Sequence, residues 1–366
     1  MKKINIAFIK YAGCASGGTE KFLQTIAANL NKKIFKVDYF YCDSAPYIGS
    51  DWIHPDTDIF RKKIMEESEV KLKKFVVGHK DVTTRIHRWI NSDFWEIFDE
   101  KKYDLIFFTN AGAPEYPYTE ILDTPLINIV TVNGGVFDQD NLYKAILISN
   151  DSSKVWINQG GNKKKLIVIP LCREEIIKTK DNFKDELSID QKFIYGFHQR
   201  EDDKIFSEVP LKAYKRIENE NNHFLLLGGS KLYSKQSKDL NINNFTQLDF
   251  SSDTKIIDKF LNSLNVFCHG RKHGETMGLV LTEAMSYGIP VISHKAESNA
   301  QVEVVGNAGK VYSKKNIFQY SNLMKKLENN SSFYKEISNN AIKRYENVYS
   351  THIILKKYEK MVKSFL

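Results

Sequence analysis

Short apolar runs of strand length recur along the chain, separated by amphipathic or polar stretches, and this alternation limits the folds open to it. In the first half the runs cover residues 4–9, 37–41, 105–109, 126–132, 145–149 and 166–169. A second series covers residues 193–197, 223–227, 245–248 and 266–269. Apolar strands that alternate with helices are typical of parallel sheets. We therefore predict an α/β protein with two parallel-sheet domains, the first of which ends near residue 172.

Two stretches depart from this alternation. Residues 173–190 are charged and weakly patterned, and we predict that they link the two domains. Residues 50–103 combine aromatic side chains with many lysines and arginines and are predicted to be mostly helical. One interpretation is a pair of core-packing helices with solvated basic faces. The alternative is a basic amphipathic surface, within residues 50–100, that meets a membrane or an anionic acceptor.

Composition narrows the class of protein. The apolar fraction of 42% and the charged fraction of 27% are ordinary for a globular protein. No run approaches the roughly 18 apolar residues of a membrane-spanning helix. The four cysteines lie far apart, without a CxxC pair, which favours reduced thiols and a cytoplasmic location. A net charge of +8 favours anionic partners, but no motif of a nucleic-acid-binding module appears, so we expect no nucleic-acid partner.

The stretch from residue 274 to residue 292, GETMGLVLTEAMSYGIPVI, holds the most specific chemistry. A short helix is predicted inside it, because Gly288 can end a helix and Pro290 prevents it from continuing. The first turn of such a helix has free amide groups and a partial positive charge, which together bind anions. Glu275 precedes this turn, and Glu283 lies further along the helix. A phosphate flanked by hydroxyl-bearing groups, as in a nucleotide-sugar, suits this arrangement.

This stretch resembles a motif of the retaining nucleotide-sugar glycosyltransferases of the GT-B fold, the glycogen-synthase-like group 1 family. The shared pattern is a carboxylate, seven residues, a second Glu, then Ala-Met and Gly-x-Pro-Val. Residues 303–309 (EVVGNAG) resemble a second family segment. The resemblance, clear over residues 190–312, implies two Rossmann-like domains facing each other across a cleft. Residues 1–172 would form the acceptor side and residues 190–350 the donor side, with a C-terminal helix over residues 351–366 crossing back to the first domain.

The resemblance assigns the two carboxylates different roles. It implies that Glu275 acts in catalysis against the hydroxyl groups of the donor sugar. It also implies that Glu283 accepts hydrogen bonds from the two ribose hydroxyls of the nucleotide. The turn between them would hold the diphosphate through backbone amides. The donor-binding residues of this turn are Thr276, Met277, Gly278 and Leu279. Two solvated glutamates around a helix are the alternative.

The positive charge that the family directs at the diphosphate is only partly matched. The family has an Arg and a Lys in a G-R-x-x-x-x-K loop after the first strand of the second domain, and here Phe197 stands in the Arg position. Arg200 and Lys204 are the predicted catalytic substitutes, and plain surface charges are the alternative for both. Arg271 and Lys272 are further candidates for the same positive field, although a solvated loop explains them equally well.

Further donor-side candidates follow from their places in the family's pattern. Gly229 belongs to a glycine loop that we expect to close over the nucleotide. Leu248 ends a short strand whose following loop is expected to meet the nucleobase, with Gln247 and Asp253 as neighbouring candidates.

The first half offers candidates by placement alone. Gly17 and Gly18, which we assign to donor binding, follow the first strand and precede a helix, as in a phosphate-binding loop; a plain tight turn is the alternative. Asn110 and Asn133 follow two later strands, and ligands bind at the carboxyl ends of such strands. We assign both asparagines to the acceptor side.

No metal site is predicted. Two DxD triplets, residues 56–58 and 138–140, occur outside the context expected of a metal site, and the nine histidines show no metal-binding spacing. We therefore predict metal-independent, retaining transfer of a sugar from a nucleoside-diphosphate-sugar, which is a co-substrate, without any cofactor.

The predicted acceptor is a glycan, a lipid-linked molecule or another hydroxyl compound. One alternative is a non-catalytic GT-B protein that binds a nucleotide or carbohydrate, with the unusual loop after residue 196 as the warning sign. The other is a GT-B epimerase or phosphorylase. We expect a cytoplasmic location, with peripheral contact at a membrane surface as a variant of it.

Overall fold

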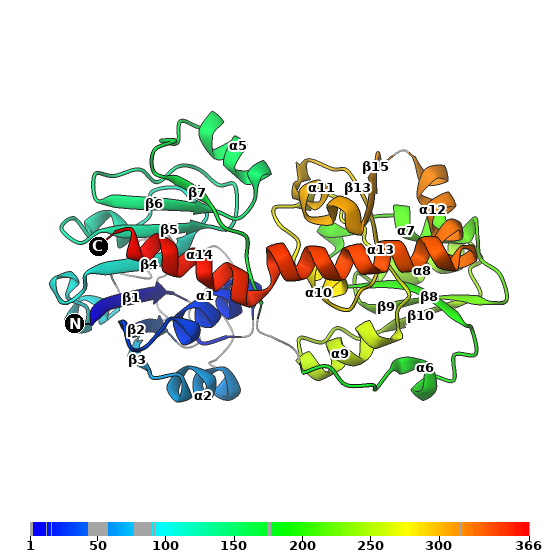
Figure 1. Cartoon of the computed structure of the whole chain (residues 1–366), viewed down its shortest axis with the longest axis horizontal. Helices are drawn as coiled ribbons and strands as arrows, with labels where there is room; N and C mark the ends of the chain where they lie inside the picture. Colours follow the sequence, from blue (N-terminus) through cyan, green and yellow to red (C-terminus); the bar gives the residue numbers. More distant parts are fainter. Residues whose placement is uncertain are drawn as a thin grey trace. The chain divides into compact units, whose positions relative to one another are not determined.

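The computed structural model of the chain describes residues 3–11, 13–15, 17–42, 58–76, 90, 92–173, 177–314 and 316–365. These residues form two compact units (Figure 1). The first unit comprises Met1–Glu174 together with Ile354–Leu366, and the second comprises Glu175–Ile353. Each unit is built on a parallel sheet of its own, which confirms the predicted α/β class.

The first unit contains a seven-stranded sheet of order β3-β2-β1-β4-β5-β6-β7. All its strand pairs are parallel. The strands are β1 (Ile4–Lys10), β2 (Phe35–Cys42), β3 (Val70–Phe75), β4 (Leu105–Asn110), β5 (Leu126–Val130), β6 (Leu142–Leu147) and β7 (Leu166–Val168). The main helices are α1 (Gly18–Asn29), α2 (Ile59–Glu67), α4 (Phe94–Ile97) and α5 (Asn150–Asn158). The central strands β4 and β5 are buried almost throughout and almost entirely apolar, as their sequences indicated and as a sheet covered on both faces requires.

The prediction that residues 50–103 are mostly helical holds for α2, α4 and a short 3-10 helix at Glu100–Lys102, but it is wrong for residues 70–75. Residues 70–75 form the edge strand β3, which pairs with β2 from Val37↔Val70 to Cys42↔Phe75. The sequence VKLKKF has apolar ends that are buried and lysines between them, a composition that keeps an exposed sheet edge polar. Backbone pairing with β2 therefore decides the conformation of residues 70–75, whose own sequence favours neither helix nor strand strongly.

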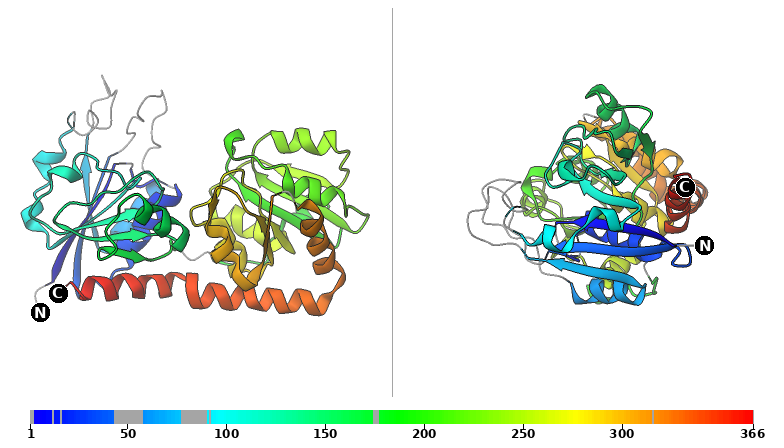
Figure 2. Two further views of the ribbon diagram at one scale, coloured as in Figure 1. Left: turned by 90° about the horizontal axis from the view of Figure 1, so that it is seen from above. Right: turned by 90° about the vertical axis from the view of Figure 1, so that its left-hand side faces the viewer.

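The C-terminal helix α14 (Thr351–Lys363) joins the first unit from residue 354 onward (Figure 2). Its Tyr358 is fully buried, with ring centroids 6.1 Å from Phe22 and 6.4 Å from Phe107. At its end, Ser364 lies 3.3 Å from the hydroxyl of Tyr143. The chain thus returns to the first unit after completing the second, as predicted.

The second unit contains a six-stranded parallel sheet of order β10-β9-β8-β11-β13-β15. Its strands are β8 (Phe193–Gln199), β9 (Asn222–Gly228), β10 (Phe245–Leu248), β11 (Val266–Cys268), β13 (Val291–His294) and β15 (Gly309–Tyr312). Two short strands, β12 (Gly274–Glu275) and β14 (Ser298–Asn299), pair separately. The helices are α6 (Phe183–Glu186), α7 (Val209–Lys215), α8 (Leu232–Asp239), α9 (Thr254–Ser263), α10 (Leu279–Ser286), α11 (Ala300–Val305), α12 (Ile317–Asn329) and α13 (Ser331–Arg344).

The predicted linker is not a free connection. Residues 177–190 pack on the second unit, where the Thr179 hydroxyl donates to Asp258 of α9 at 2.6 Å. The amide of the buried Phe183 donates to Ser263 at 2.7 Å. The charged sequence hid these anchors because each of them is a single hydrogen bond to a helix about 80 residues further on.

Among the described residues, no helix is both long and apolar enough to cross a bilayer. All four cysteines are buried, and they form no disulfide with one another.

Candidate functional site

Helix α10 begins at a glycine that its backbone requires. Gly278, the residue before the helix, has φ +85°, a left-handed conformation that strains any residue with a Cβ atom. A Cβ atom there would also lie 2.9 Å from Leu281 Cδ1 and 3.1 Å from Glu275 Cγ. The chain therefore turns tightly between Glu275 and the helix. As predicted, Gly288 ends α10 with φ +71°, and β13 follows.

Glu275 lies behind this turn and is held by two cationic or potentially cationic side chains. Its Oε1 is 3.1 Å from His269 Nε2. Arg271 Nη1 lies 3.3 Å from Oε1 and 3.2 Å from Oε2. The backbone amide of Glu275 donates to Gln301 Oε1 at 3.1 Å. The carboxylate and its peptide group are thus both fixed, although Glu275 is only 8% exposed.

Two opposing effects set the protonation state of Glu275. Burial raises its pKa, since a charged carboxylate is costly to desolvate. The hydrogen bond and charge of His269, followed by those of Arg271, lower it by more, so the net pKa lies below the ordinary value. Glu275 is therefore a buried carboxylate that stays ionised at neutral pH.

A second layer of buried groups holds His269 in place. His269 is 3% exposed and follows β11, and its Nδ1 lies 2.7 Å from the hydroxyl of Ser293 on β13. Tyr320 donates its hydroxyl to the carbonyls of His269 and Ile292, at 3.2 and 3.1 Å. The carboxyl ends of β11 and β13 are therefore joined by side chains as well as by their backbone pairing.

Glu283 lies on α10 and faces a different histidine. His198 Nε2, at the end of β8, is 2.8 Å from Glu283 Oε2, although the angle is poor for a hydrogen bond. The His198 ring is flanked by Phe260 and Phe267, at centroid distances of 5.9 and 5.8 Å. Both side chains keep partial exposure, 10% for His198 and 13% for Glu283. The two predicted carboxylates thus occupy separate surroundings at the same end of the sheet.

The predicted cations Arg200 and Lys204 lie in the loop after β8. Arg200 is well exposed and pairs with Asp202 at 2.7 Å, while Lys204 is exposed on a short 3-10 helix, Asp203–Ile205. Phe197 is fully buried and packs on Phe224 and Tyr233. An arginine at this position would have to point into the core. The positive charges of the loop are therefore at Arg200 and Lys204, further along the chain.

This loop is attached to the Glu275 segment. Gln199 donates to the carbonyl of Gly270 at 3.2 Å, and the amide of Lys272 donates to Ile205 at 3.1 Å. Gly229, in the loop after β9, donates its amide to Gln199 at 2.7 Å. Hydrogen bonds therefore join the loops after β8, β9 and β11.

The candidates near the predicted nucleobase loop are mostly engaged in structural contacts. Gln247 donates to the carbonyls of Gly228, Gly229 and Ser230, so its side chain fastens the glycine loop. Asp253 caps α9 by accepting from the amide of Lys255. Leu248 is the half-buried last residue of β10, two positions before the half-exposed Phe250.

The acceptor-side candidates Asn110 and Asn133 lie in the first unit, at the carboxyl ends of β4 and β5. The Asn110 side chain holds its own loop, accepting from the amide of Gly112 at 2.7 Å. Gly134, next to the half-buried Asn133, donates its amide to Ala111 at 2.8 Å, which joins the two loops.

Gly17 and Gly18 are exposed at the start of α1. Here the carboxylate of Glu20 folds back over the helix start, so that a Cβ atom on Gly17 would lie 2.2 Å from it, and it pairs with Lys10 at 3.1 Å. Its negative charge makes this helix start a poorer phosphate site than that of α10.

No metal centre is visible in the part of the chain that the structure describes, where no three His, Cys, Asp or Glu side chains gather. Asp138, of the second DxD triplet, pairs with Lys165 at 2.8 Å. In the first triplet Asp58 caps α2, and residues 56 and 57 lie outside the described residues.

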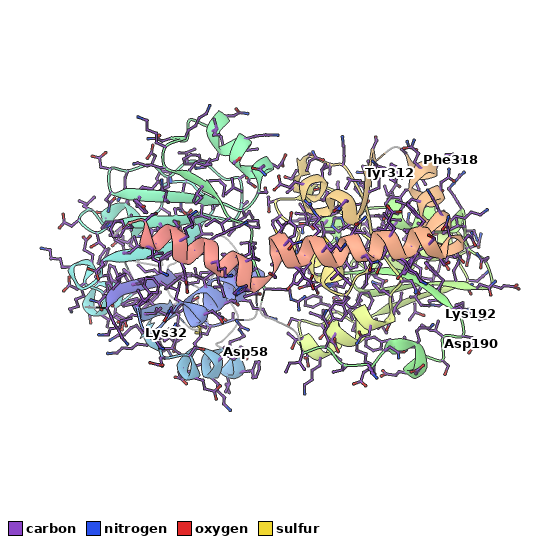
Figure 3. All side chains as sticks on the ribbon, viewed as in Figure 1. Lys32, Asp58, Asp190, Lys192, Tyr312 and Phe318 are labelled. Atoms are coloured by element: carbon purple, nitrogen blue, oxygen red, sulfur yellow. The ribbon has the colours of Figure 1, made fainter. Side chains whose placement is uncertain are left out.

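A cavity of about 600 Å³ in the second unit lies elsewhere, beside β15 and the helices α12 and α13. Tyr312, labelled in Figure 3, lines it, and none of the predicted site residues does so.

Sequence reasoning missed the partners of the two carboxylates. The missed residues are His198, His269, Ser293 and Gln301. The available signal was position: His198 and His269 end buried strands, where side chains reach the ligand-binding edge of a parallel sheet.

Comparison with known proteins identifies the relatives of this arrangement. Residues 178–344 match the family model of the group 1 glycosyl transferases. Over 107 residues the chain is 33% identical to the capsular polysaccharide biosynthesis glycosyltransferase CapM of Staphylococcus aureus. This match covers 29% of the chain and 28% of CapM, so it spans well under half of either protein.

Solved structures resemble the whole chain. HepE of Anabaena, solved with UDP and glucose, superimposes with a TM-score of 0.72 at 18% identity, over 99% of this chain and 100% of that one. Sucrose-phosphate synthase of Thermosynechococcus elongatus superimposes with a TM-score of 0.72 at 15% identity, over 99% of both chains. With its two parallel-sheet units, the chain has the GT-B fold.

Proposed function

We propose that this chain, whose second unit belongs to the group 1 glycosyl transferases, moves a sugar from a nucleoside diphosphate to an acceptor hydroxyl with retention of configuration. In this proposal Glu283 receives the ribose hydroxyls, the start of α10 receives the diphosphate, and Glu275 receives the hydroxyls of the sugar. Arg200 and Lys204 add positive charge from the loop after β8 and stabilise the departing diphosphate.

One observation carries this proposal most: an ionised, buried Glu275 lies directly behind the start of α10. The left-handed Gly278 has no side chain that could cap the helix, and in this proposal the amides of the first turn receive the diphosphate. An ionised carboxylate accepts hydrogen bonds from sugar hydroxyls, and a helix start attracts phosphate. The sugar and the diphosphate of a nucleotide-sugar therefore meet complementary groups within a few residues.

The donor proposed for the first test is UDP-glucose. Its support is the structural neighbour HepE, which was solved with UDP and glucose and with UDP-glucose. The partial match to CapM, a protein of capsular polysaccharide biosynthesis, supports a glycan or lipid-linked acceptor.

The test is a panel of UDP-, GDP-, ADP- and dTDP-sugars, each examined by thermal shift and by release of nucleoside diphosphate. We expect at least one nucleotide-sugar to stabilise the chain and to be hydrolysed slowly or transferred to an added acceptor. Proton NMR of the product then reports whether the anomeric configuration is retained. Activity that persists in EDTA would agree with metal-independent transfer. No stabilisation by any nucleotide would sink the proposal.

The same panel separates the alternatives. A binding protein would be stabilised by a nucleotide-sugar without consuming it, and the exposed Arg200–Asp202 pair in place of a buried arginine is the feature that favours this alternative. An epimerase would convert the donor without an acceptor, whereas a phosphorylase would require inorganic phosphate.

Contact with a membrane surface is the remaining proposal. Helix α2 exposes Ile59 and Phe60, at 83% and 65%, and β3 carries exposed lysines. Two lysines of α2 already pair with Glu66 and Glu67, which weakens the charge available to anionic lipid. Sedimentation with vesicles that contain anionic lipid, compared with neutral vesicles, tests this contact.

A further inference from the structure

His269 connects two groups that are far apart in the sequence. Its ring has a partner on each nitrogen: Ser293 Oγ at 2.7 Å from Nδ1, and Glu275 Oε1 at 3.1 Å from Nε2. All three residues are buried, with exposures of 0% for Ser293, 3% for His269 and 8% for Glu275. A buried imidazole with both nitrogens engaged has one orientation available to it.

The partners also determine the direction of the hydrogen bonds. An ionised carboxylate only accepts, so His269 Nε2 must carry a proton toward Glu275. If the ring is neutral, Nδ1 is then an acceptor, and the Ser293 hydroxyl donates to it. If the ring is charged, Nδ1 donates to the hydroxyl instead. In both states His269 is a donor to Glu275.

The carboxyl ends of β11 and β13 hold Ser293, His269 and Glu275 in place. His269 follows β11, Ser293 lies on β13, and the two strands pair in parallel. The hydroxyl of Tyr320 bridges the carbonyls of His269 and Ile292. Gln301 accepts from the Glu275 amide and donates to the carbonyl of His294 at 3.0 Å. Glu275 is therefore fixed from its backbone and from its carboxylate.

Other titratable groups near this line do not replace His269. Arg271 contacts both oxygens of Glu275, but its side chain is 31% exposed and therefore screened by solvent. His294, next to Ser293, bonds to Ser207 through Nε2 at 2.7 Å, and burial lowers its pKa to about 4. His294 is therefore neutral at physiological pH. His269 is the buried donor to the Glu275 side chain among the described contacts.

We propose that His269, held by Ser293, is a positioning residue for glycosyl transfer: it holds the Glu275 carboxylate in the single orientation in which that carboxylate meets the hydroxyls of the donor sugar. The proposal rests on the proposed function, because it assumes that Glu275 contacts the donor. Displacing a reacting or orienting group by about 1 Å can cost on the order of 100-fold in rate, so a fixed carboxylate matters to turnover. Arg271 contacts the carboxylate through one nitrogen, Nη1, which both oxygens share.

Two substitutions separate positioning from mere packing, because each keeps one half of the histidine. A Gln amide can place its nitrogen near the position of Nε2, so His269→Gln keeps the bond to Glu275 and loses that to Ser293. An Asn amide reaches the position of Nδ1, so His269→Asn keeps the bond to Ser293 and loses that to Glu275. We expect His269→Asn to lower kcat by about 10- to 100-fold with little change in the KM for the donor. His269→Gln should recover most of that loss.

The pH profile gives a readout that a packing role would not move. Loss of the His269 hydrogen bond raises the pKa of Glu275, because one of the groups that stabilise its charge is gone. The acidic limb of kcat/KM should therefore move to higher pH in His269→Asn and remain near the wild-type position in His269→Gln.

His223→Asn is the matched control. His223 is buried, with 8% of its surface exposed, and its Nε2 lies 3.0 Å from the hydroxyl of Thr246. It lies at the amino end of β9, whereas the site lies at the carboxyl ends of the strands. This substitution should cost stability like those at His269 but leave kcat and the pH profile unchanged. Equal losses in His269→Asn and His269→Gln, with unmoved acidic limbs, would overturn the proposal.

A failure of the proposed function would look different. In that case the wild-type chain turns over no nucleotide-sugar, and the proposal is tested on the free protein. Carbon NMR of labelled glutamate then follows the titration of Glu275. A pKa that rises in His269→Asn but not in His269→Gln would support the holding of the carboxylate, whereas no change in either variant would refute it.

Discussion

Glu275 shows how opposing effects are resolved at a single residue. Burial alone would protonate this side chain, but a histidine and an arginine reverse the outcome. If one partner of such a carboxylate is removed, the carboxylate still carries the full desolvation cost of burial. Each contact therefore contributes more to stability than a surface ion pair of the same length. A carboxylate held in this way is suited to a ligand that brings hydroxyl groups and no countercharge.

The stability contributed by Glu275 should depend on pH in a defined direction. Because its folded pKa is lowered from an ordinary value of 4.5, the contribution is complete above that pH and disappears as pH falls through the folded pKa. Urea unfolding of wild type and Glu275→Gln, between about pH 3 and about pH 7, measures it. The difference should be largest near neutrality and shrink below about pH 4.5. A difference that grows toward acid would contradict the lowered pKa.

The two carboxylates should separate in binding experiments. Glu283→Ala should weaken the binding of free nucleoside diphosphate by roughly 100-fold, because two hydrogen bonds from hydroxyls to a charged group contribute about 3 kcal/mol. Glu275→Ala should lower turnover of the nucleotide-sugar and leave the affinity for free nucleotide nearly unchanged. Calorimetric titration and product release measure the two quantities. Equal effects of both substitutions on free nucleotide would contradict the assigned roles.

At the scale of elements, α10 converts a local turn into a ligand position. Its buried residues, Leu281, Thr282, Ala284 and Met285, anchor it in the second unit. Its start is determined by Gly278 and its end by Gly288. Because Ile342 and Ser338 of α13 pack where a Cβ atom of Gly288 would lie, this end is also fixed from outside.

Gly278→Ala should therefore damage the site beyond ordinary backbone strain. A left-handed alanine costs about 1 to 2 kcal/mol, and the contacts with Leu281 and Glu275 add to this cost. Gly160→Ala is the matched control: it has φ +97° and no atom within 4 Å of the added Cβ. Both substitutions should lower the melting temperature, but only Gly278→Ala should weaken nucleotide binding by thermal shift. Equal binding by both variants would argue against a ligand at the start of α10.

At the scale of the molecule, each unit contains a complete sheet of its own, and the C-terminal residues belong to the first unit. Tyr358 fills a fully buried position against Phe22 and Phe107, so α14 contributes to the core of that unit. A contact between residues more than 300 positions apart must form late in synthesis. The first unit therefore completes its core only after the second has been made.

Tyr358→Ala should destabilise the first unit by about 3 to 5 kcal/mol, as other large-to-small changes of buried aromatic residues do. Tyr143→Ala, at the half-exposed end of the same helix contact, should cost less than about 1.5 kcal/mol. Hydrogen exchange can assign the loss to strands of the first unit. Comparable protection losses in both variants would show that α14 is not a core element.

Particular residues mark how far sequence reasoning reached. The end of α10, six strands of the first sheet, four strands of the second and the return of the last helix were predicted correctly, apart from shifts of a few residues as at β6. Strand β3 was missed because alternating lysines and apolar residues identify a strand only beside a partner, here β2. The Arg200 loop was predicted to carry charge, but its pairing with Asp202 was not.

The sequence by itself determined the elements and the two carboxylates, because glycines, prolines and apolar periodicity act over a few residues of chain. Only the tertiary structure decided what surrounds those carboxylates. Ser293, which holds His269, and Gln301, which holds the amide of Glu275, lie 18 and 26 residues after Glu275 in the sequence. His198 contacts Glu283 across 85 residues. No local pattern marks such partners, because they meet only where a parallel sheet brings the carboxyl ends of β8, β11 and β13 to one edge.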